Sequence, residues 1–331
     1  MLGLGLPKTG FPWGRPLSMN LALSNLRVLE LGDYISAAYC GLLLADQGAE
    51  VIKIESPKGD LARHHGPFPD GRPDPEQGGL FLHLNAGKLG ITLDVATSEG
   101  ASLLRALVGQ ADVLVHNNLP QDLERWGTTY EQLRKVNPTL VMTSVTVFGH
   151  EGPYSRYKGY ALTASAAGAA AHRIGDPESY PLTLPYDRSD YWGGLNAAPS
   201  TMLALMARRH TGRGQHVDIA ITECINTLIN GLDTIIYVDT GAVTSRHGPR
   251  VPMAYPYTIL PCKDGYFGLI LCTQRQWERF VKMVGSPPLS HAPRYQDRIA
   301  VGYHYPEEVD RLIKPWLARY TKQELWTMCR L

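Results

Sequence analysis

The chain has 331 residues, of which 44% are hydrophobic and 19% charged, with 32 basic and 31 acidic residues. This hydrophobic content excludes wholesale disorder, and the length predicts about two domains. The balanced charge argues against nucleic acid or a membrane surface as a partner. No apolar run reaches the roughly 18 residues that a membrane span needs.

Residues 1–21 are expected to form a flexible leader, because the first 20 contain no acidic residue and too short an apolar stretch for a secretory signal. The five cysteines are scattered along the chain and form no C-x-x-C pair. They predict free thiols in a reducing compartment, and we expect a cytoplasmic protein.

The first elements predict a βαβ unit. Residues 26–32 and 50–55 are short apolar runs typical of buried strands, and residues 39–50 predict the helix between them. Further alternation follows, with strands predicted at 90–95, 111–117 and 140–149 and helices at 98–110 and 129–137. Such alternation predicts an open, Rossmann-like parallel sheet covered by helices on both faces.

The composition changes after residue 159. An Ala-rich helix is predicted at 160–171, a helix, turn and strand over 199–220, a helix at 221–238, a linker at 240–256, a strand at 265–272 and a helix at 275–285. We therefore expect an α/β protein with a large domain at 22–222, a helix and linker at 223–250, and a smaller α+β domain at 251–331.

Several cofactor motifs are absent from the sequence. The turn after the first strand, from Gly32 to Ala37, lacks the G-x-G-x-x-G pattern that brings a backbone close to a pyrophosphate, so we expect no NAD. No histidine pair has metal-ligand spacing, so we expect no metal. The predicted strand-end loops carry Lys58, Lys88, Asn117, Arg125 and Lys158, which together suit an adenosine-phosphate ligand.

The stretch "DRSDYWGG" places two carboxylates, Asp187 and Asp190, before Gly193 and Gly194 at the start of a predicted helix. Aspartate is a common helix cap, and glycine is a common turn residue. A carboxylate can also act as a nucleophile, and glycines after it would permit close approach of a substrate. The residues alone leave both interpretations open.

Five motifs resemble the family III CoA-transferases, the group that contains carnitine CoA-transferase and formyl-CoA:oxalate CoA-transferase. They lie in family order over nearly the whole chain, at Leu26–Asp60, Asn85–Gly100, Ala111–Gly127, Asn137–Tyr154 and Pro185–Ala220. Counting back from the T-G-R-G turn at Thr211 places the family's nucleophile at Asp190. Asp187 is then left as a cap or surface residue.

The resemblance implies an enzyme that moves CoA from an acyl-CoA to a carboxylic acid through an aspartyl-CoA thioester on Asp190, supported by Tyr160, Gly193 and Gly194. Acyl-CoA is then a substrate, and no metal or ATP is required. The partners implied are an acyl-CoA donor, an acid acceptor and a second copy in an interlocked homodimer. By position, the CoA contacts would be Asp33, Tyr34, Ile35, Ser36, Lys58, Lys88, Asn117, Asn118, Arg125, Trp126 and Lys158.

Two alternatives stay open. The α-methylacyl-CoA racemases have a similar fold and use a histidine in a G-H-D stretch, but this chain has Gly159-Tyr160-Ala161 there, which favours transfer. The family chain also continues beyond the position of Leu331, so the small domain is expected to be incomplete, and an inactive CoA-binding relative is the second alternative. Pro199 predicts that the helix after Asp190 kinks or starts late.

Overall fold

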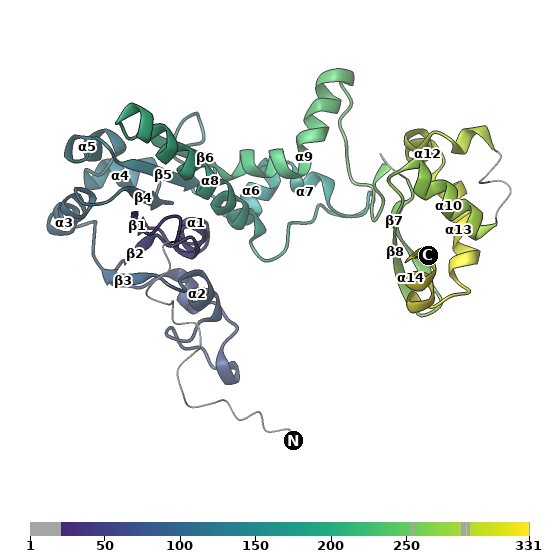
Figure 1. Ribbon diagram of the computed structural model, residues 1–331, viewed down its shortest axis with the longest axis horizontal. Helices are drawn as coiled ribbons and strands as arrows, with labels where there is room; N and C mark the ends of the chain where they lie inside the picture. Colours follow the sequence, from purple (N-terminus) through teal and green to yellow (C-terminus); the bar gives the residue numbers. More distant parts are fainter. Residues whose placement is uncertain (1–20, 253–254, 286–288, 290–291, 331) are drawn as a thin grey trace. The chain divides into compact units, whose positions relative to one another are not determined.

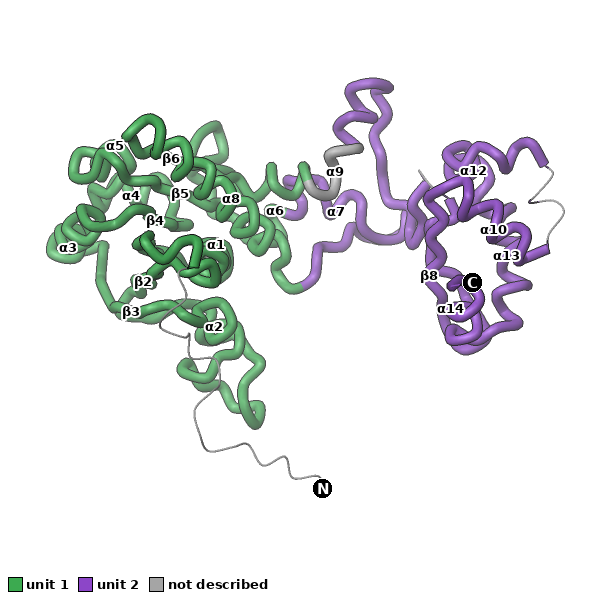
Figure 2. Tube along the Cα trace, in the orientation of Figure 1, with its two compact units in different colours: residues 1–164, 186–227 green, residues 165–185, 228–331 purple. Residues whose placement is uncertain are grey.

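The computed structural model describes residues 21–252, 255–285, 289 and 292–330, with the backbone alone for 228–232 (Figure 1). The expected leader therefore lies almost entirely outside the described residues. The chain divides into two compact units, one of Met1–Ala164 with Tyr186–Thr227 and the other of Ser165–Pro185 with Leu228–Leu331 (Figure 2). The predicted large domain at 22–222 differs from the first unit because residues 165–185 group with the second.

The first unit contains the predicted parallel sheet, in the order β3-β2-β1-β4-β5-β6. This is the strand order of doubly wound sheets, in which the direction of winding reverses between β1 and β4. Val28 of β1 lies opposite Val51 of β2 and Val113 of β4. The strands are β1 (Arg27–Leu31), β2 (Glu50–Glu55), β3 (Leu89–Thr92), β4 (Val113–His116), β5 (Val141–Thr146) and β6 (His216–Ala220).

Helices cover the sheet in two layers. On one side, Leu29 and Leu114 pack against Leu104, Leu123 and Leu133 of three helices. These are α3 (Ser98–Val108), α4 (Pro120–Trp126) and α5 (Tyr130–Val136), and they lie together on one side of the sheet in Figure 1. The helices α1 (Ser36–Asp46) and α8 (Arg188–Thr211) pack against each other and against the sheet, while α2 (Gly79–Leu84) and the first four residues of α6 (Ala161–Ala167) complete the unit.

Helix α8 places the predicted nucleophile. It begins at Arg188 and runs without interruption through Pro199, so the expectation of a late start is wrong. A proline inside a helix removes one backbone hydrogen bond and crowds the preceding turn. The packing of α8 against α1, β5 and β6 compensates for that loss.

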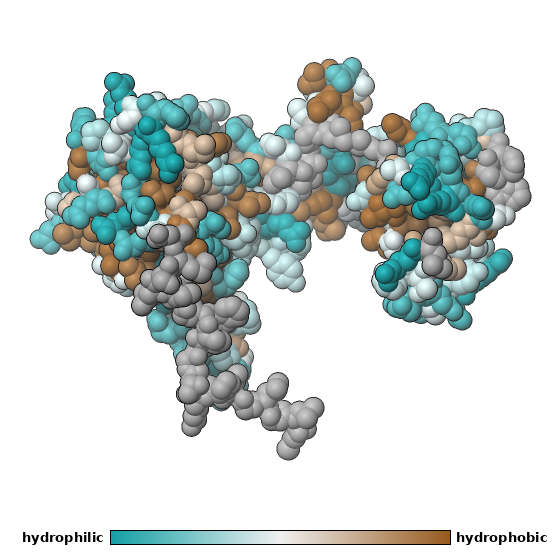
Figure 3. Space-filling model, viewed as in Figure 1, coloured by the Kyte–Doolittle hydropathy of each residue, from teal (hydrophilic) through white to brown (hydrophobic). Residues whose placement is uncertain are grey.

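The second unit is built around an antiparallel hairpin and its own aromatic core. The core includes Trp277, Tyr295 and Trp316. Residues 241–251, which lie within the expected linker at 240–256, form no helix or strand. Exposed apolar side chains, among them Ile235 and Val238, gather on the second half of α9 (Figure 3). The elements are α7 (Ala170–Arg173), most of α9 (Ile221–Thr240), β7 (Tyr257–Cys262), β8 (Gly265–Ile270), α10 (Gln274–Val284), α12 (Arg298–His304), α13 (Pro306–Leu317) and α14 (Lys322–Arg330).

Candidate active site

The loop between β1 and α1 is held by an amide at the end of β4. The Asn117 side chain accepts the Asp33 N–H at 3.0 Å and donates to the Asp33 carbonyl at 2.6 Å and to Ser36 Oγ at 3.1 Å. Next to it, Asn118 Nδ2 donates to the Leu31 carbonyl at 2.7 Å. The direction of winding reverses between the neighbouring strands β1 and β4. These hydrogen bonds therefore lie at the crevice in which doubly wound sheets bind ligands.

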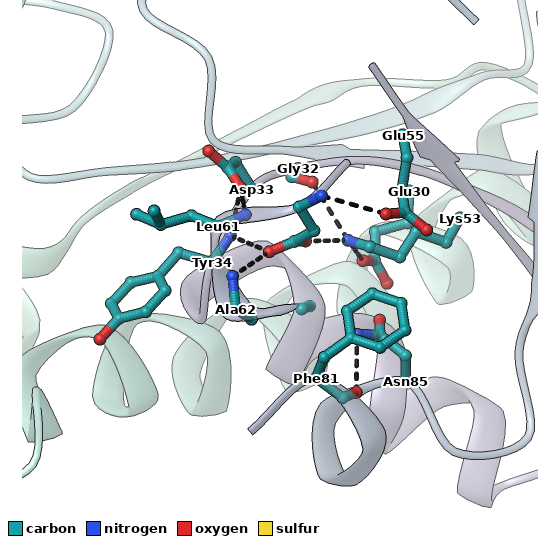
Figure 4. Close-up of polar contacts among 12 residues, drawn as sticks. Glu30, Gly32, Asp33, Tyr34, Lys53, Glu55, Leu61, Ala62, Phe81 and Asn85 are labelled. Carbon is teal, nitrogen blue, oxygen red and sulfur yellow. Dashed lines mark hydrogen bonds and ion pairs between the residues drawn. The ribbon is translucent and has the colours of Figure 1, made fainter. Parts of the chain in front are cut away.

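A buried charge cluster supports the other side of this loop (Figure 4). Lys53 Nζ lies 2.9 Å from Glu30 Oε1 and 2.6 Å from Asp60 Oδ2, and all three side chains are almost fully buried. Burial alone would lower the pKa of Lys53, but the two carboxylates raise it above its ordinary value. Asp60 Oδ1 in turn accepts the N–H groups of Tyr34 at 3.0 Å and Ala62 at 2.7 Å. The cluster thereby fixes the backbone at Tyr34.

A cavity of about 540 Å³, hereafter the first cavity, opens at the carboxyl ends of β1, β4 and β5. It brings together nine of the residues expected in the site. These are Asp33, Tyr34, Ile35, Ser36, Asn117, Asn118, Lys158, Tyr160 and Asp190. Sequence reasoning missed His65, Asp122 and the participation of Asp187, all of which line the same cavity.

Asp190 lies in the first turn of α8, where its backbone N–H donates to the Asp187 carbonyl at 2.9 Å. Its side chain faces the first cavity and is half-buried. Burial, and then the negative charge of Asp187, raise the pKa of Asp190 to about 7. A carboxylate with such a pKa is more basic than an ordinary aspartate and still ionises near neutral pH, which suits a nucleophile or a general base.

Asp187 occupies the N-cap position of α8, but its side chain makes no capping hydrogen bond. Its carboxylate instead accepts the Tyr34 hydroxyl at 2.5 Å. Of the two roles expected for Asp187, a cap or a surface residue, the cap is wrong, since the residue has a left-handed φ of 49° where an ordinary N-cap has extended backbone. Tyr34 and Tyr186 also have left-handed φ angles, of 64° and 57°. Backbone strain of this kind clusters at functional sites.

The two glycines after Asp190 do not line the first cavity. An added Cβ on Gly193 would lie 2.7 Å from the Ile221 side chain, and one on Gly194 would lie 2.5 Å from the Ser36 carbonyl. Their place in the structure corrects the expected role, since they allow α8 to pack closely against α1 and the sheet. The room that we expected them to give a substrate is filled by protein.

A second cavity, of about 510 Å³, opens at the ends of β1, β2 and β3. Lys58 and Trp126 line it, and Asp33 and Asn118 line both cavities. Trp126 Nε1 is buried and has no hydrogen-bond partner among the described residues. The second cavity therefore offers a lysine cation and an aromatic surface.

Two expected contacts line neither cavity. The Lys88 ammonium is buried and donates to Glu30 Oε2 at 2.7 Å and to the Ala38 carbonyl at 2.7 Å. Arg125 is exposed, pairs with Asp122 at 2.9 Å and lies over the Trp126 ring. Lys88 lies in a loop, as expected, but its side chain turns inward and pairs with the buried Glu30.

Among the described residues, no group of three or more His, Cys, Asp or Glu side chains is arranged to hold a metal ion. Within the described part of the chain, no helix is both long and apolar enough to cross a membrane.

A parallel sheet with cavities at the ends of its strands, one of them containing an aspartate of raised pKa, is the arrangement of an α/β enzyme. The chain belongs to CoA-transferase family III, whose model matches residues 23–331. The resemblance inferred from the motifs is thereby confirmed, and the class of reaction is CoA transfer between a thioester and an acid.

Similar proteins that are named as CoA-transferases agree with this assignment. The chain is 35% identical to succinyl-CoA–D-citramalate CoA-transferase of Chloroflexus aurantiacus, over 92% of this chain and 75% of the relative. It is 31% identical to succinate–glutarate CoA-transferase of Agrobacterium fabrum, over 93% and 77%. A crystal structure of a CAIB/BAIF family protein from Brucella suis superposes with a TM-score of 0.79 at 30% identity, covering 94% of this chain and 82% of that one.

Proposed function

We propose that this protein transfers CoA from an acyl-CoA to a second carboxylic acid through a covalent aspartyl-CoA thioester on Asp190. The observation that carries the proposal is the position of Asp190. This aspartate of raised pKa lines the 540 Å³ cavity at the point where the winding of the sheet reverses. A carboxylate nucleophile divides one difficult exchange into two easier ones.

The ionised Asp190 carboxylate attacks the acyl carbonyl of the donor thioester. This gives an acyl-aspartyl anhydride and releases CoA thiolate. The thiolate attacks the aspartyl carbonyl of the anhydride, which forms aspartyl-CoA and frees the donor acid. The acceptor carboxylate then attacks aspartyl-CoA, and the returning thiolate takes the acceptor's acyl group from the new anhydride. The aspartate is regenerated, and one thioester replaces another.

The other groups of the two cavities have complementary tasks in this proposal. Lys158 and Tyr160 line the first cavity and would meet the thioester and the acid carboxylates. Lys58 in the second cavity would bind a phosphate, and Trp126 would stack on the adenine. The names of the relatives favour a dicarboxylic donor such as succinyl-CoA.

The test is to trap the intermediate. Wild-type protein mixed with succinyl-CoA should gain a covalent CoA adduct in intact-mass spectrometry, and hydroxylamine should convert Asp190 to its hydroxamate. Asp190→Ala and Asp190→Asn should lose the adduct and lower transfer on the order of 10³-fold or more. The exposed Asp46, at the end of α1, provides a matched control in Asp46→Asn.

Turnover at the wild-type rate in folded Asp190→Ala would contradict the proposal. The racemase alternative makes a separate prediction, because it would move deuterium from solvent into the acyl-CoA without any acid acceptor. Deuterium uptake together with no transfer would replace the proposed function by that alternative.

We also propose a homodimer in the cytoplasm. The exposed apolar side chains of Leu195, Leu203 and Met206 on α8 support a partner surface, and the five cysteines, all free, suit a reducing compartment. Light scattering that gives the mass of one chain at micromolar concentration would exclude the dimer.

A further inference from the structure

Two segments far apart in sequence meet at the wall of the first cavity. The Tyr34 hydroxyl, from the β1–α1 loop, donates to Asp187 Oδ2 at 2.5 Å across 153 residues of sequence. Both residues have left-handed φ angles, 64° for Tyr34 and 49° for Asp187. Backbone of this kind is strained and persists only where the surroundings impose it.

The surroundings of Tyr34 do impose it. Its backbone N–H is held by Asp60 Oδ1 at 3.0 Å and by Asp33 Oδ1 at 3.0 Å. Asp60 is in turn fixed by Lys53 in the buried charge cluster, and the Tyr34 ring points away from that cluster in Figure 4. A rigid base therefore aims the phenol at Asp187.

The position of Asp187 connects it to Asp190. It caps no helix, and its side chain lines the same cavity as Asp190, three residues further along α8. The Asp187 carbonyl also accepts the Asp190 N–H at 2.9 Å. A change in the position of Asp187 would therefore move the nucleophile as well.

We propose that Tyr34 and Asp187 form a positioning pair that ties the start of α8 to the β1–α1 loop and keeps a second carboxylate fixed beside Asp190. The pair acts through Asp190 and does not itself react. The inference deepens the proposed function and rests on it for its catalytic meaning.

A fixed neighbouring charge opposes ionisation of Asp190 and makes the resulting carboxylate more basic. The cavity holds other titratable groups that face the same space. They are Asp33 and Tyr34 from the β1–α1 loop, His65 after the 3₁₀ turn at Leu61–His64, Asp122 from α4, and Tyr157, Lys158 and Tyr160 before α6. After burial, the charge that raises the pKa of Asp190 is that of Asp187. Burial and the negative charge of Asp187 raise the pKa of Tyr34, so its hydroxyl stays protonated and keeps donating to Asp187.

The experiment is a carboxyl-carbon NMR titration of protein labelled at the aspartate side chains, with Asp190 assigned from Asp190→Asn. In Asp187→Asn we expect the Asp190 midpoint to fall by about one pH unit, because the neighbouring charge is gone. Tyr34→Phe should lower the midpoint in the same direction, since Asp187 then loses its donor and can turn towards water. The double variant should have the same Asp190 midpoint as Asp187→Asn alone, as expected of two residues that act as one unit.

The pH profile of kcat/KM gives a second readout. In Asp187→Asn the acid limb of the profile should move to lower pH, so kcat/KM of the variant should exceed that of wild type in acid. At alkaline pH the variant's kcat/KM should be the lower one, because its Asp190 carboxylate is less basic. An Asp190 midpoint unchanged in folded Asp187→Asn, or additive shifts in the double variant, would overturn the inference. Absence of a CoA adduct in wild type, with the midpoint shifts present, would refute the proposed function and leave the pair standing.

Discussion

Lys58 and Lys88 show how two residues of one type acquire different tasks. Lys58 is exposed and lines the second cavity, whereas the Lys88 ammonium is buried against Glu30 at 2.7 Å. We predict that Lys88→Met lowers the free energy of unfolding by about 3–5 kcal/mol, because Glu30 stays buried and keeps only Lys53 as a cation among the described residues. Urea denaturation followed by fluorescence measures this loss.

Lys58→Met provides the matched control. It should keep wild-type stability within about 0.5 kcal/mol and weaken CoA binding about tenfold, because a phosphate loses one charge-assisted contact. Calorimetric titration with CoA measures the affinity. A Lys88→Met protein of normal stability with impaired CoA binding would show that Lys88 meets the ligand after all.

Helix α8 is the element on which the site depends. Gly194 brings it so close to α1 that a Cβ would lie 2.5 Å from the Ser36 carbonyl and 3.1 Å from the Cys40 nitrogen. We predict that Gly194→Ala lowers the free energy of unfolding by about 1–3 kcal/mol, since backbone atoms must shift to make room, even though alanine favours a helix. Activity should fall as well, because the same shift displaces Asp190.

Gly90→Ala serves as the control for Gly194→Ala. Gly90 lies in β3 with ordinary φ, and apart from its chain neighbours no atom of the described residues lies within 4 Å of an added Cβ. This change should leave stability within about 0.5 kcal/mol of wild type. Equal stability losses in both glycine variants would mean that close packing of α8 is not the cause.

At the scale of the whole molecule, the alternation of strand-like and helical segments in the sequence predicted the six strands of the parallel sheet at whose ends the site lies. The short helices α2 and α4 escaped prediction. The direction of the Lys88 side chain and the Tyr34–Asp187 hydrogen bond depend on contacts between distant segments. No local pattern records such contacts.

Three histidines, His116, His150 and His216, form a cluster in the first unit. His116 is fully buried, with Nδ1 accepting the Asn118 N–H at 3.2 Å and Nε2 at 2.8 Å from Ser144 Oγ. Ser144 Oγ also lies 2.6 Å from His216 Nε2, and the His150 ring stands about 5.5 Å from both other rings. Burial lowers the pKa of His116, His150 and His216, and the neighbouring rings lower that of His116 further.

The sign of the effect follows from linkage. Since these histidines bind protons less readily in the folded state, the unfolded chain takes up protons first as the pH falls. We predict that stability declines as the pH drops below about 6.5, the ordinary histidine pKa, and that His116→Gln makes this decline shallower. Urea midpoints measured between about pH 8 and pH 5 test it, with the exposed His210→Gln as the control. If His116→Gln and His210→Gln gave the same slope as wild type, the acid sensitivity would have to come from other groups.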